Sequence, residues 1–214
     1  GTPASEIADT FSAIAKYFIK QKKDPDFYFE YSINEKVALE IAGAAAISGL
    51  RAITSMKHVG LNVASDTFMT YMYIGCRGGH LIVTADDPYC HSSQNEQDNR
   101  YYALFGGAPM LEPSTPNEAK EMTRIGFEIS EKLQSPILLR TTTRLNHVRS
   151  SIKLKKMQKP KRIGNFEKNP MWVTTPDIAR ARHPELLKML KVAEELSDNS
   201  EFNKIINIGE SSDW

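Results

Sequence analysis

Cysteine is scarce in this sequence, and long apolar runs are missing from it. Cys76 and Cys90 are the only cysteines among 214 residues, which excludes a disulfide scaffold and a thiolate cluster for zinc or an iron–sulfur centre. No apolar run approaches the roughly 20 residues that cross a bilayer, and the first residues lack the pattern of a signal peptide. The net charge of +1 provides no overall field for nucleic acid. We therefore expect a cytoplasmic protein without nucleic-acid or membrane partners.

What is present is the composition of a folded globular protein, 41% hydrophobic and 25% charged. Nearly continuous apolar segments at residues 79–85 and 136–140 are typical of buried parallel strands. Shorter strands are predicted at 27–31, 51–56 and 109–111. Between them, periodicity predicts helices over 4–18, 34–49, 60–76, 95–105, 115–133 and 177–196. This alternation predicts an α/β fold, with an open, mostly parallel sheet and helices on both faces.

Three helix starts carry capping residues. Thr2 and Pro3 form a favourable helix entry, and the helix that follows has an apolar face that we expect to be buried. Asn34 is a candidate cap for the second helix, which consists largely of small residues. Thr115 is followed three residues later by Glu118, the pattern of a capping box.

The character of the chain changes after residue 150. Six lysines and arginines cluster around Pro160 with few large apolar residues. Because aromatic residues are not interleaved with them, a solvated linker is favoured over a nucleic-acid patch. We therefore expect an α/β domain at 1–150, and a basic linker, a helix and a tail leading toward a next domain at 151–214.

Ligands of open parallel sheets bind beyond the carboxyl ends of the strands, so the loops there are candidate sites. The sequence has no glycine-rich dinucleotide fingerprint and no phosphate-cradling lysine motif. Cys90 and His91 are a conceivable nucleophilic pair, but adjacent residues on an extended loop point in opposite directions. Asp86 and Asp87 could bind a metal, although a pair that caps the loop is the favoured interpretation.

Glu35 is the most informative single residue. It stands at the start of a predicted helix, where a carboxylate favours the positive end of the helix dipole. On residue type alone, a capping role is favoured over a catalytic one.

Six longer segments, taken in order along the chain, form a recognisable pattern: residues 1–6, 34–40, 55–62, 86–88, 91–98 and 182–184. Together they resemble the alpha subunit of indolepyruvate ferredoxin oxidoreductase, a family of thiamine diphosphate-dependent 2-oxoacid:ferredoxin oxidoreductases. The resemblance covers nearly the whole chain and implies a Rossmann-like thiamine diphosphate-binding fold, in which this chain is similar to the pyrimidine-binding domain.

The resemblance implies oxidative decarboxylation of an aryl 2-oxoacid such as indolepyruvate to its acyl-coenzyme A, with ferredoxin as electron acceptor. Glu35 matches the family glutamate that hydrogen-bonds N1′ of the pyrimidine. Thr2 matches a threonine near the substrate and thiazolium, and Lys57 and His58 are implied near the substrate carboxylate or the pyrimidine. The next family motif supplies further candidate substrate contacts, which are His91, Gln94, Asn95 and Arg100.

Parts of the family pattern are missing from the 214 residues. The Gly-Asp-Gly and Asn motif for Mg²⁺ and the diphosphate is absent, as are the clustered cysteines for 4Fe–4S centres, so no metal site is expected in this chain. The resemblance implies that other domains of the alpha subunit, or a beta subunit, supply them in a hetero-oligomer. Two alternatives stay open: a noncatalytic assembly domain of the same fold, and a subunit of a pyruvate or 2-oxoglutarate enzyme.

Overall fold

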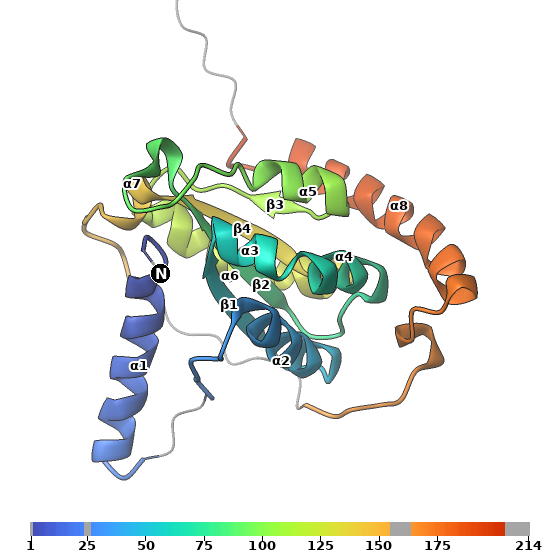
Figure 1. The fold of residues 1–214 in the computed structure, drawn as a ribbon, viewed down its shortest axis with the longest axis horizontal. Coiled ribbons are helices and arrows are strands. Elements are labelled where there is room, and N and C mark those ends of the chain that lie inside the picture. Colours follow the sequence, from blue (N-terminus) through green and yellow to red (C-terminus); the bar gives the residue numbers. More distant parts are fainter. Residues whose placement is uncertain (1, 24–26, 155–163, 204–214) are drawn as a thin grey trace, which may run out of the picture.

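A four-stranded parallel sheet forms the centre of the computed structural model, which describes residues 2–23, 27–154 and 164–203. All its pairings are parallel, which confirms the predicted α/β fold (Figure 1). In sheet order the strands are β1 (Ala52–Lys57), β2 (His80–Asp86), β4 (Ile137–Thr142) and β3 (Met110–Leu111).

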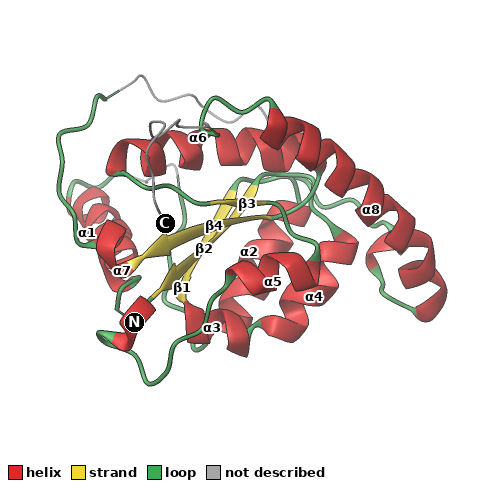
Figure 2. Cartoon of the chain, turned by 90° about the horizontal axis from the view of Figure 1, so that it is seen from above, coloured by secondary structure: helices red, strands yellow, loops and turns green. Residues whose placement is uncertain are grey.

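Helices cover both faces of the sheet, as the sequence predicts (Figure 2). One face carries α2 (Glu35–Ile47), α3 (His58–Val63), α4 (Ser65–Ile74) and α5 (Arg100–Gly106), and α8 (Pro176–Asp198) joins this layer. The other face carries α6 (Pro116–Leu133) and the first turns of α1 (Ser5–Lys20). Three short helices lie in connections: α7 (Thr143–Asn146) and the 3-10 turns Pro88–Cys90 and Pro170–Trp172.

The core lies on both sides of β2, all of whose residues are buried. Because successive side chains of a strand point to opposite faces, Ile82 joins the cluster under α2, α3 and α4, whereas Val83 joins the cluster under α6. Burial on both faces explains why this strand is a nearly continuous apolar run.

The first helix departs from the prediction. It begins at Ser5 rather than at Thr2, and the residue before it, Ala4, makes no side-chain cap. The predicted apolar face is half buried rather than fully buried: no residue of α1 is fully buried and Ile14 is 40% exposed. The partly buried residues of this face are Ile7, Ala8, Phe11, Ala15 and Phe18. The reason is its place at the rim of the sheet, where Ile7 alone reaches the core cluster under α6.

The predicted strand at residues 27–31 is also wrong, because residues 28–31 belong to no strand. Their aromatic side chains pack against α1 instead. The Phe11 ring stacks on Phe29 at 6.3 Å and meets Phe27 edge-on at 5.9 Å. The Tyr31 hydroxyl donates a hydrogen bond of 2.6 Å to Asp9. Aromatic composition thus reflects contact with a helix here, not pairing in the sheet.

Two predicted helices have different limits. The helix expected over 60–76 is divided at Ala64 into α3 and α4, and α3 begins two residues earlier, at His58. The helix expected over 95–105 begins at Arg100, because the Asn99 backbone N–H before it donates to Asp86. The second difference involves a tertiary contact that periodicity does not report.

Several helix features are confirmed. The Asn34 side chain caps α2 by accepting a 2.9 Å hydrogen bond from Val37 N–H, and Thr115 caps α6 by accepting from Glu118 N–H. The basic cluster lies largely outside the described residues, and the domain division near residue 150 stays a prediction. Within the part of the chain that the structure describes, no helix combines the length and apolarity needed to span a bilayer.

A buried histidine joins β1, β2 and α4. His80 is fully buried, and its ring nitrogens hydrogen-bond the hydroxyl groups of Thr54 at 2.8 Å and Tyr71 at 3.0 Å. Burial lowers the pKa of His80 to about 3, so the ring is neutral in the folded protein.

This burial predicts acid sensitivity. In the unfolded chain a histidine takes up a proton near pH 6.5, whereas folded His80 does so only near pH 3. We therefore expect His80 to lower the free energy of unfolding by about 1.4 kcal/mol per pH unit below pH 6.5. Denaturant unfolding at pH 7, 6 and 5 measures this slope, and His80→Phe should reduce it. An unchanged slope in the variant would contradict a neutral buried ring.

Candidate functional site

The carboxyl edge of the sheet brings the start of α2 against the start of α3. The chain enters α3 directly after β1, so Lys57 ends the strand and His58 begins the helix. Glu35 is the first residue of α2, and its half-buried side chain lies over Gly60 in α3. Two segments that are distant in the sequence therefore meet at one carboxylate.

Gly60 makes room for this carboxylate. A Cβ atom at residue 60 would lie 2.6 Å from Glu35 Cγ and 2.9 Å from Glu35 Oε1, which is closer than real Cβ atoms approach other atoms. Within the described part of the chain, no hydrogen bond or ion pair engages the Glu35 carboxylate. Since Asn34 already caps α2, Glu35 is not needed as the cap, which removes the main reason for that interpretation.

Lys57 and His58 hold the loop that connects β2 to α5. Lys57 Nζ donates a 2.8 Å hydrogen bond to the backbone oxygen of Ser92. The His58 ring is fully buried, and its Nε2 donates to the backbone oxygen of Asn95 at 3.0 Å. Both residues therefore shape one wall of the carboxyl edge, in addition to any contact with a ligand.

Asp87 organises the same loop from inside. Its carboxylate accepts hydrogen bonds from Ser92 N–H at 2.7 Å and from the hydroxyls of Ser93 and Thr143, each at 2.6 Å. Burial raises the pKa of Asp87, but these hydrogen bonds outweigh it and hold the pKa well below its usual range. The loop-capping interpretation of the Asp86–Asp87 pair is therefore supported, and the described residues contain no cluster of three potential metal ligands.

Asp86 belongs to a buried network that the sequence did not reveal. Its Oδ2 accepts from Arg140 Nε at 2.8 Å and from Asn99 N–H at 3.0 Å. Burial raises the pKa of Asp86, whereas the hydrogen bonds from Asn99 and Arg140 oppose that rise. Arg140 is only 5% exposed, and the one sequence signal for it was a charged residue inside an apolar strand.

The predicted substrate residues lie along the surface of this loop. His91 and Gln94 are exposed, and the His91 ring packs beside Tyr89 at 5.6 Å. Asn95 is joined to His58 through its backbone, and Arg100 forms an ion pair with Asp98 at 2.6 Å. The structure brings only Asn95 and His58 together, so the substrate roles stay predictions.

Thr2 precedes α1 in a turn with a cis peptide bond to Pro3. The start of α1 lies near α7, since Glu6 Oε1 is 3.7 Å from His147 Nδ1. Because α7 directly follows β4, this turn lies at the carboxyl edge as well (Figure 1). No contact joins Thr2 to Glu35 among the described residues, and its role near a ligand stays a prediction.

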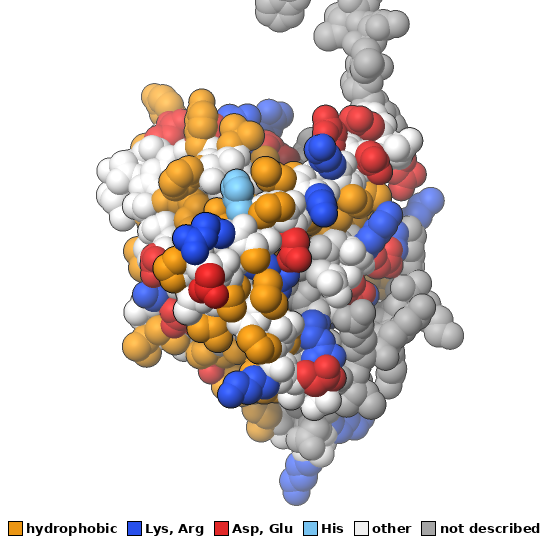
Figure 3. Space-filling view, turned by 90° about the vertical axis from the view of Figure 1, so that its right-hand side faces the viewer, with side chains coloured by type: hydrophobic (Ala, Val, Ile, Leu, Met, Phe, Trp, Pro, Cys, Tyr) orange, Lys and Arg blue, Asp and Glu red, His pale blue; other side chains and the backbone are white. Residues whose placement is uncertain are grey.

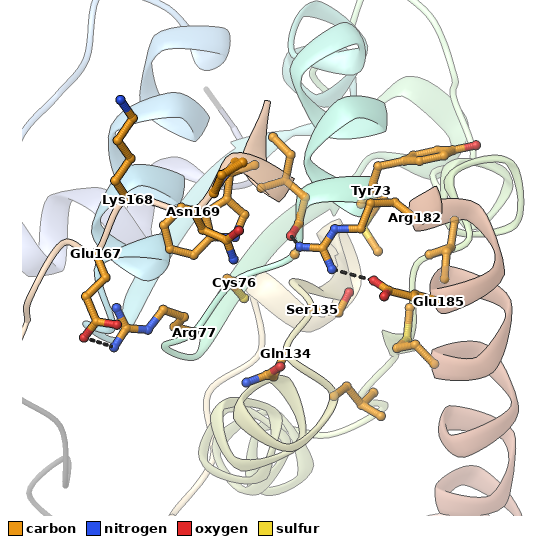
Figure 4. A pocket seen from close by; sticks show the side chains of 18 residues that line it. Tyr73, Cys76, Arg77, Gln134, Ser135, Glu167, Lys168, Asn169, Arg182 and Glu185 are labelled. Atoms are coloured by element: carbon orange, nitrogen blue, oxygen red, sulfur yellow. Dashed lines mark hydrogen bonds and ion pairs between the residues drawn. The ribbon is translucent and has the colours of Figure 1, made fainter. Parts of the chain in front are cut away.

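A cavity of about 590 Å³ lies at the opposite edge of the sheet, near the residues that precede β2 and β4 (Figure 4). Arg182 of α8 enters it, donates to the backbone oxygen of Ile74 at 3.3 Å and pairs with Glu185 at 2.6 Å. A second pair, Arg77 and Glu167, lies at its rim. The cavity is thus separate from the edge that carries Glu35.

Comparison with known proteins finds relatives of the chain. No protein-family model matches the sequence. The whole chain is 48% identical to "Indolepyruvate oxidoreductase subunit IorA" of Methanothermobacter marburgensis, covering 34% of that protein. Over 96% of the chain it is 50% identical to the subunit of the same name from Thermococcus kodakarensis, covering 32% of it. The chain is therefore similar, over its whole length, to one region of the IorA subunits. It spans about a third of the length of these curated relatives.

The fold of this chain also has a solved counterpart. It is similar to a 2-oxoglutarate:ferredoxin oxidoreductase from Magnetococcus marinus, whose structure has 2-oxoglutarate, coenzyme A and succinyl-CoA bound. The TM-score is 0.57 at 14% identity, over 94% of this chain and 41% of that one. At this identity the likeness concerns the fold.

The close fit of Glu35 over Gly60 predicts a specific effect of Gly60→Ala. We expect the new methyl group to turn the Glu35 side chain away from α3, because the atoms nearest to that methyl group belong to the flexible Glu35 side chain. Gly43→Ala is the control. Gly43 lies in α2, the helix that begins at Glu35, and a Cβ there would come no closer than 3.4 Å to the Tyr71 ring. Crystal structures of both variants measure the position of Glu35. An unmoved Glu35 in Gly60→Ala would contradict the proposed fit.

Proposed function

We propose that this chain supplies the pyrimidine half of a thiamine diphosphate site in a 2-oxoacid:ferredoxin oxidoreductase, with Glu35 as its essential acid. The observation that carries the proposal is the single Glu35 carboxylate at the carboxyl edge, fitted over Gly60 and without a hydrogen-bond partner in the described chain. Ligands of parallel α/β sheets bind at this edge.

The residues present fit one part of the cofactor. When bound, thiamine diphosphate would supply a nucleophilic carbon and an electron sink for decarboxylation of the 2-oxoacid. The task of Glu35 is to share a proton with N1′ of the pyrimidine from a fixed position. The close contact of the Glu35 side chain with the backbone of Gly60 fixes that position. A proton contact of this kind requires such preorganisation.

The loop that Lys57 and His58 hold, between β2 and α5, is proposed to bind the substrate. By fixing the backbone at Ser92 and Asn95, they position His91 and Gln94 to donate hydrogen bonds to the carboxylate of a 2-oxoacid. Lys57 also places a positive charge at this edge. Thr2, at the same edge, completes the proposed set together with Arg100.

The diphosphate half of the cofactor does not fit this chain. The described residues offer no cluster of three potential metal ligands, and the sequence has only two cysteines. Mg²⁺, the diphosphate contacts and the 4Fe–4S centres are therefore proposed on further domains of the subunit or on a second subunit of a hetero-oligomer. The relatives have about two thirds of their length beyond the part that this chain matches, which supports further domains.

The proposed overall reaction is oxidation of an aryl 2-oxoacid, such as indolepyruvate, to its acyl-coenzyme A, with electrons passed to ferredoxin in the cytoplasm. The aryl substrate is supported by the name of the IorA relatives at 45–50% identity. The likeness to a 2-oxoglutarate enzyme rests on 14% identity and supports the fold rather than that substrate.

The acid role predicts the effect of Glu35→Gln in the complete oxidoreductase. We expect the variant to lower kcat about 100-fold or more, because an amide does not share a proton with N1′ as a carboxyl does. The matched control is Glu40→Gln in the same helix, whose carboxylate contacts Lys36 and Thr67 at the surface. The assay is 2-oxoacid-dependent reduction of ferredoxin or a dye. Wild-type turnover by Glu35→Gln would favour a noncatalytic assembly domain.

The substrate class predicts a separate result. With the complete wild-type enzyme, kcat/KM for indolepyruvate should exceed that for pyruvate and for 2-oxoglutarate. Each additional apolar group that a pocket accommodates contributes about 1–3 kcal/mol of discrimination, so a ratio of tenfold or more is expected. A preference for pyruvate or 2-oxoglutarate would place the chain in one of those enzymes instead.

A further inference from the structure

After Arg100, its first residue, helix α5 carries apolar or aromatic side chains on its inner and its outer side, which is unusual for a helix at a protein surface. Its inner side packs into the core through Ala103 and Gly106, which are buried. Its outer side presents Tyr101, Leu104 and Phe105, which are 69%, 78% and 82% exposed. A helix that is hydrophobic all round is normally buried. The outer side of α5 is therefore a candidate surface for contact with a partner.

Two of these exposed side chains, Tyr101 and Phe105, line a hollow of about 500 Å³ between α4 and α5, together with Met69 of α4. The two acidic residues of the lining are already paired within the chain, Asp66 with Lys36 at 3.6 Å and Asp98 with Arg100 at 2.6 Å.

We define Met69, Tyr101, Leu104 and Phe105 as the α5 patch. Its apolar side chains fit an aliphatic or aromatic side chain of a partner.

Hydrophobic side chains are also frequent on one face of the molecule. Figure 3 shows more of them on one half of the face that it presents, interspersed with charged side chains. Exposed apolar side chains that lie together, as Tyr101, Leu104 and Phe105 do, mark interaction sites in folded proteins.

We infer that the α5 patch is the docking surface for the remainder of the same subunit, the part of the polypeptide outside residues 1–214. The length of the relatives argues for this occupant, since about two thirds of each lies beyond the matched region. Position argues for it too, because α5 starts from the Asp86 network at the carboxyl edge. The inference rests on the proposed function only in assigning further domains to the subunit.

Photo-cross-linking in the complete oxidoreductase tests this docking. The photoreactive amino acid p-benzoylphenylalanine replaces Phe105 in one variant and Leu154, which is 87% exposed away from the patch, in the control. We expect position 105 to cross-link to peptides from outside residues 1–214 with a yield at least about tenfold above position 154, since cross-linking requires direct contact. Mass spectrometry identifies the peptides.

Three outcomes of this experiment overturn the inference. Cross-links to residues 1–214 of another copy would make the α5 patch a homodimer contact, cross-links to a different subunit would make it a subunit interface, and no cross-link would leave it exposed. Because the readout does not require turnover, it is independent of the Glu35→Gln assay.

A second variant covers the case in which the bulky photoreactive group itself disturbs docking. Leu104→Glu places a charge in the patch, which should raise amide hydrogen exchange of residues 100–106 at least about tenfold in the complete enzyme. Leu154→Glu is the control and should leave exchange of these residues unchanged. Equal exchange in both variants overturns the inference.

Discussion

The buried ion pair between Asp86 and Arg140 fixes the carboxyl edge of the sheet. It joins the end of β2 to β4 at 2.8 Å, and both side chains are at most 5% exposed. Removing either partner would leave a buried charge uncompensated, at a cost of about 3–5 kcal/mol. Because Asp86 also accepts from Asn99 N–H, the pair determines where α5 begins. The path of residues 86–99 follows from these contacts.

The candidate site combines fixed and free groups. Asp87, Lys57 and His58 act as the scaffold of the loop, through the Asp87 carboxylate, Lys57 Nζ and His58 Nε2. The buried His58 Nδ1 has no hydrogen-bond partner among the described residues. The carboxylate of Glu35 has no such task in the described chain and is supported by the bare backbone at Gly60. This division explains how one acid can be both well positioned and available, which is what a proton contact to a cofactor needs.

The amino edge of the sheet has a different use. Arg182 donates to the backbone at the end of α4, and the His183 ring stacks on Tyr73 at 5.9 Å with a 19° tilt. Leu186 and Met189 continue the contact into the core cluster. The segment 182–184, which carried part of the resemblance, thus attaches α8 to α4. Its residues need no catalytic role to explain their presence.

The sequence by itself determined the fold class, the buried strands and the caps of α2 and α6. These features depend on local composition and on the hydrogen bonds of neighbouring residues, as for Asn34 and Val37. The resemblance singled out Glu35, but it did not show what holds the Glu35 side chain in place. Arg140 gave little signal, because a charge inside an apolar run is explained only by its partner across the sheet.

Tertiary structure alone decided which surfaces meet. Residues 27–31 have the aromatic content of a strand, yet their rings pack on α1. Periodicity reports that a side chain is apolar but not what covers it. For this reason it did not predict that the apolar face of α1 is only half buried, or that α5 exposes Tyr101, Leu104 and Phe105. The approach of Glu35 to Gly60 joins α2 to α3 across the end of β1. Such contacts exist only once the sheet has brought distant segments together.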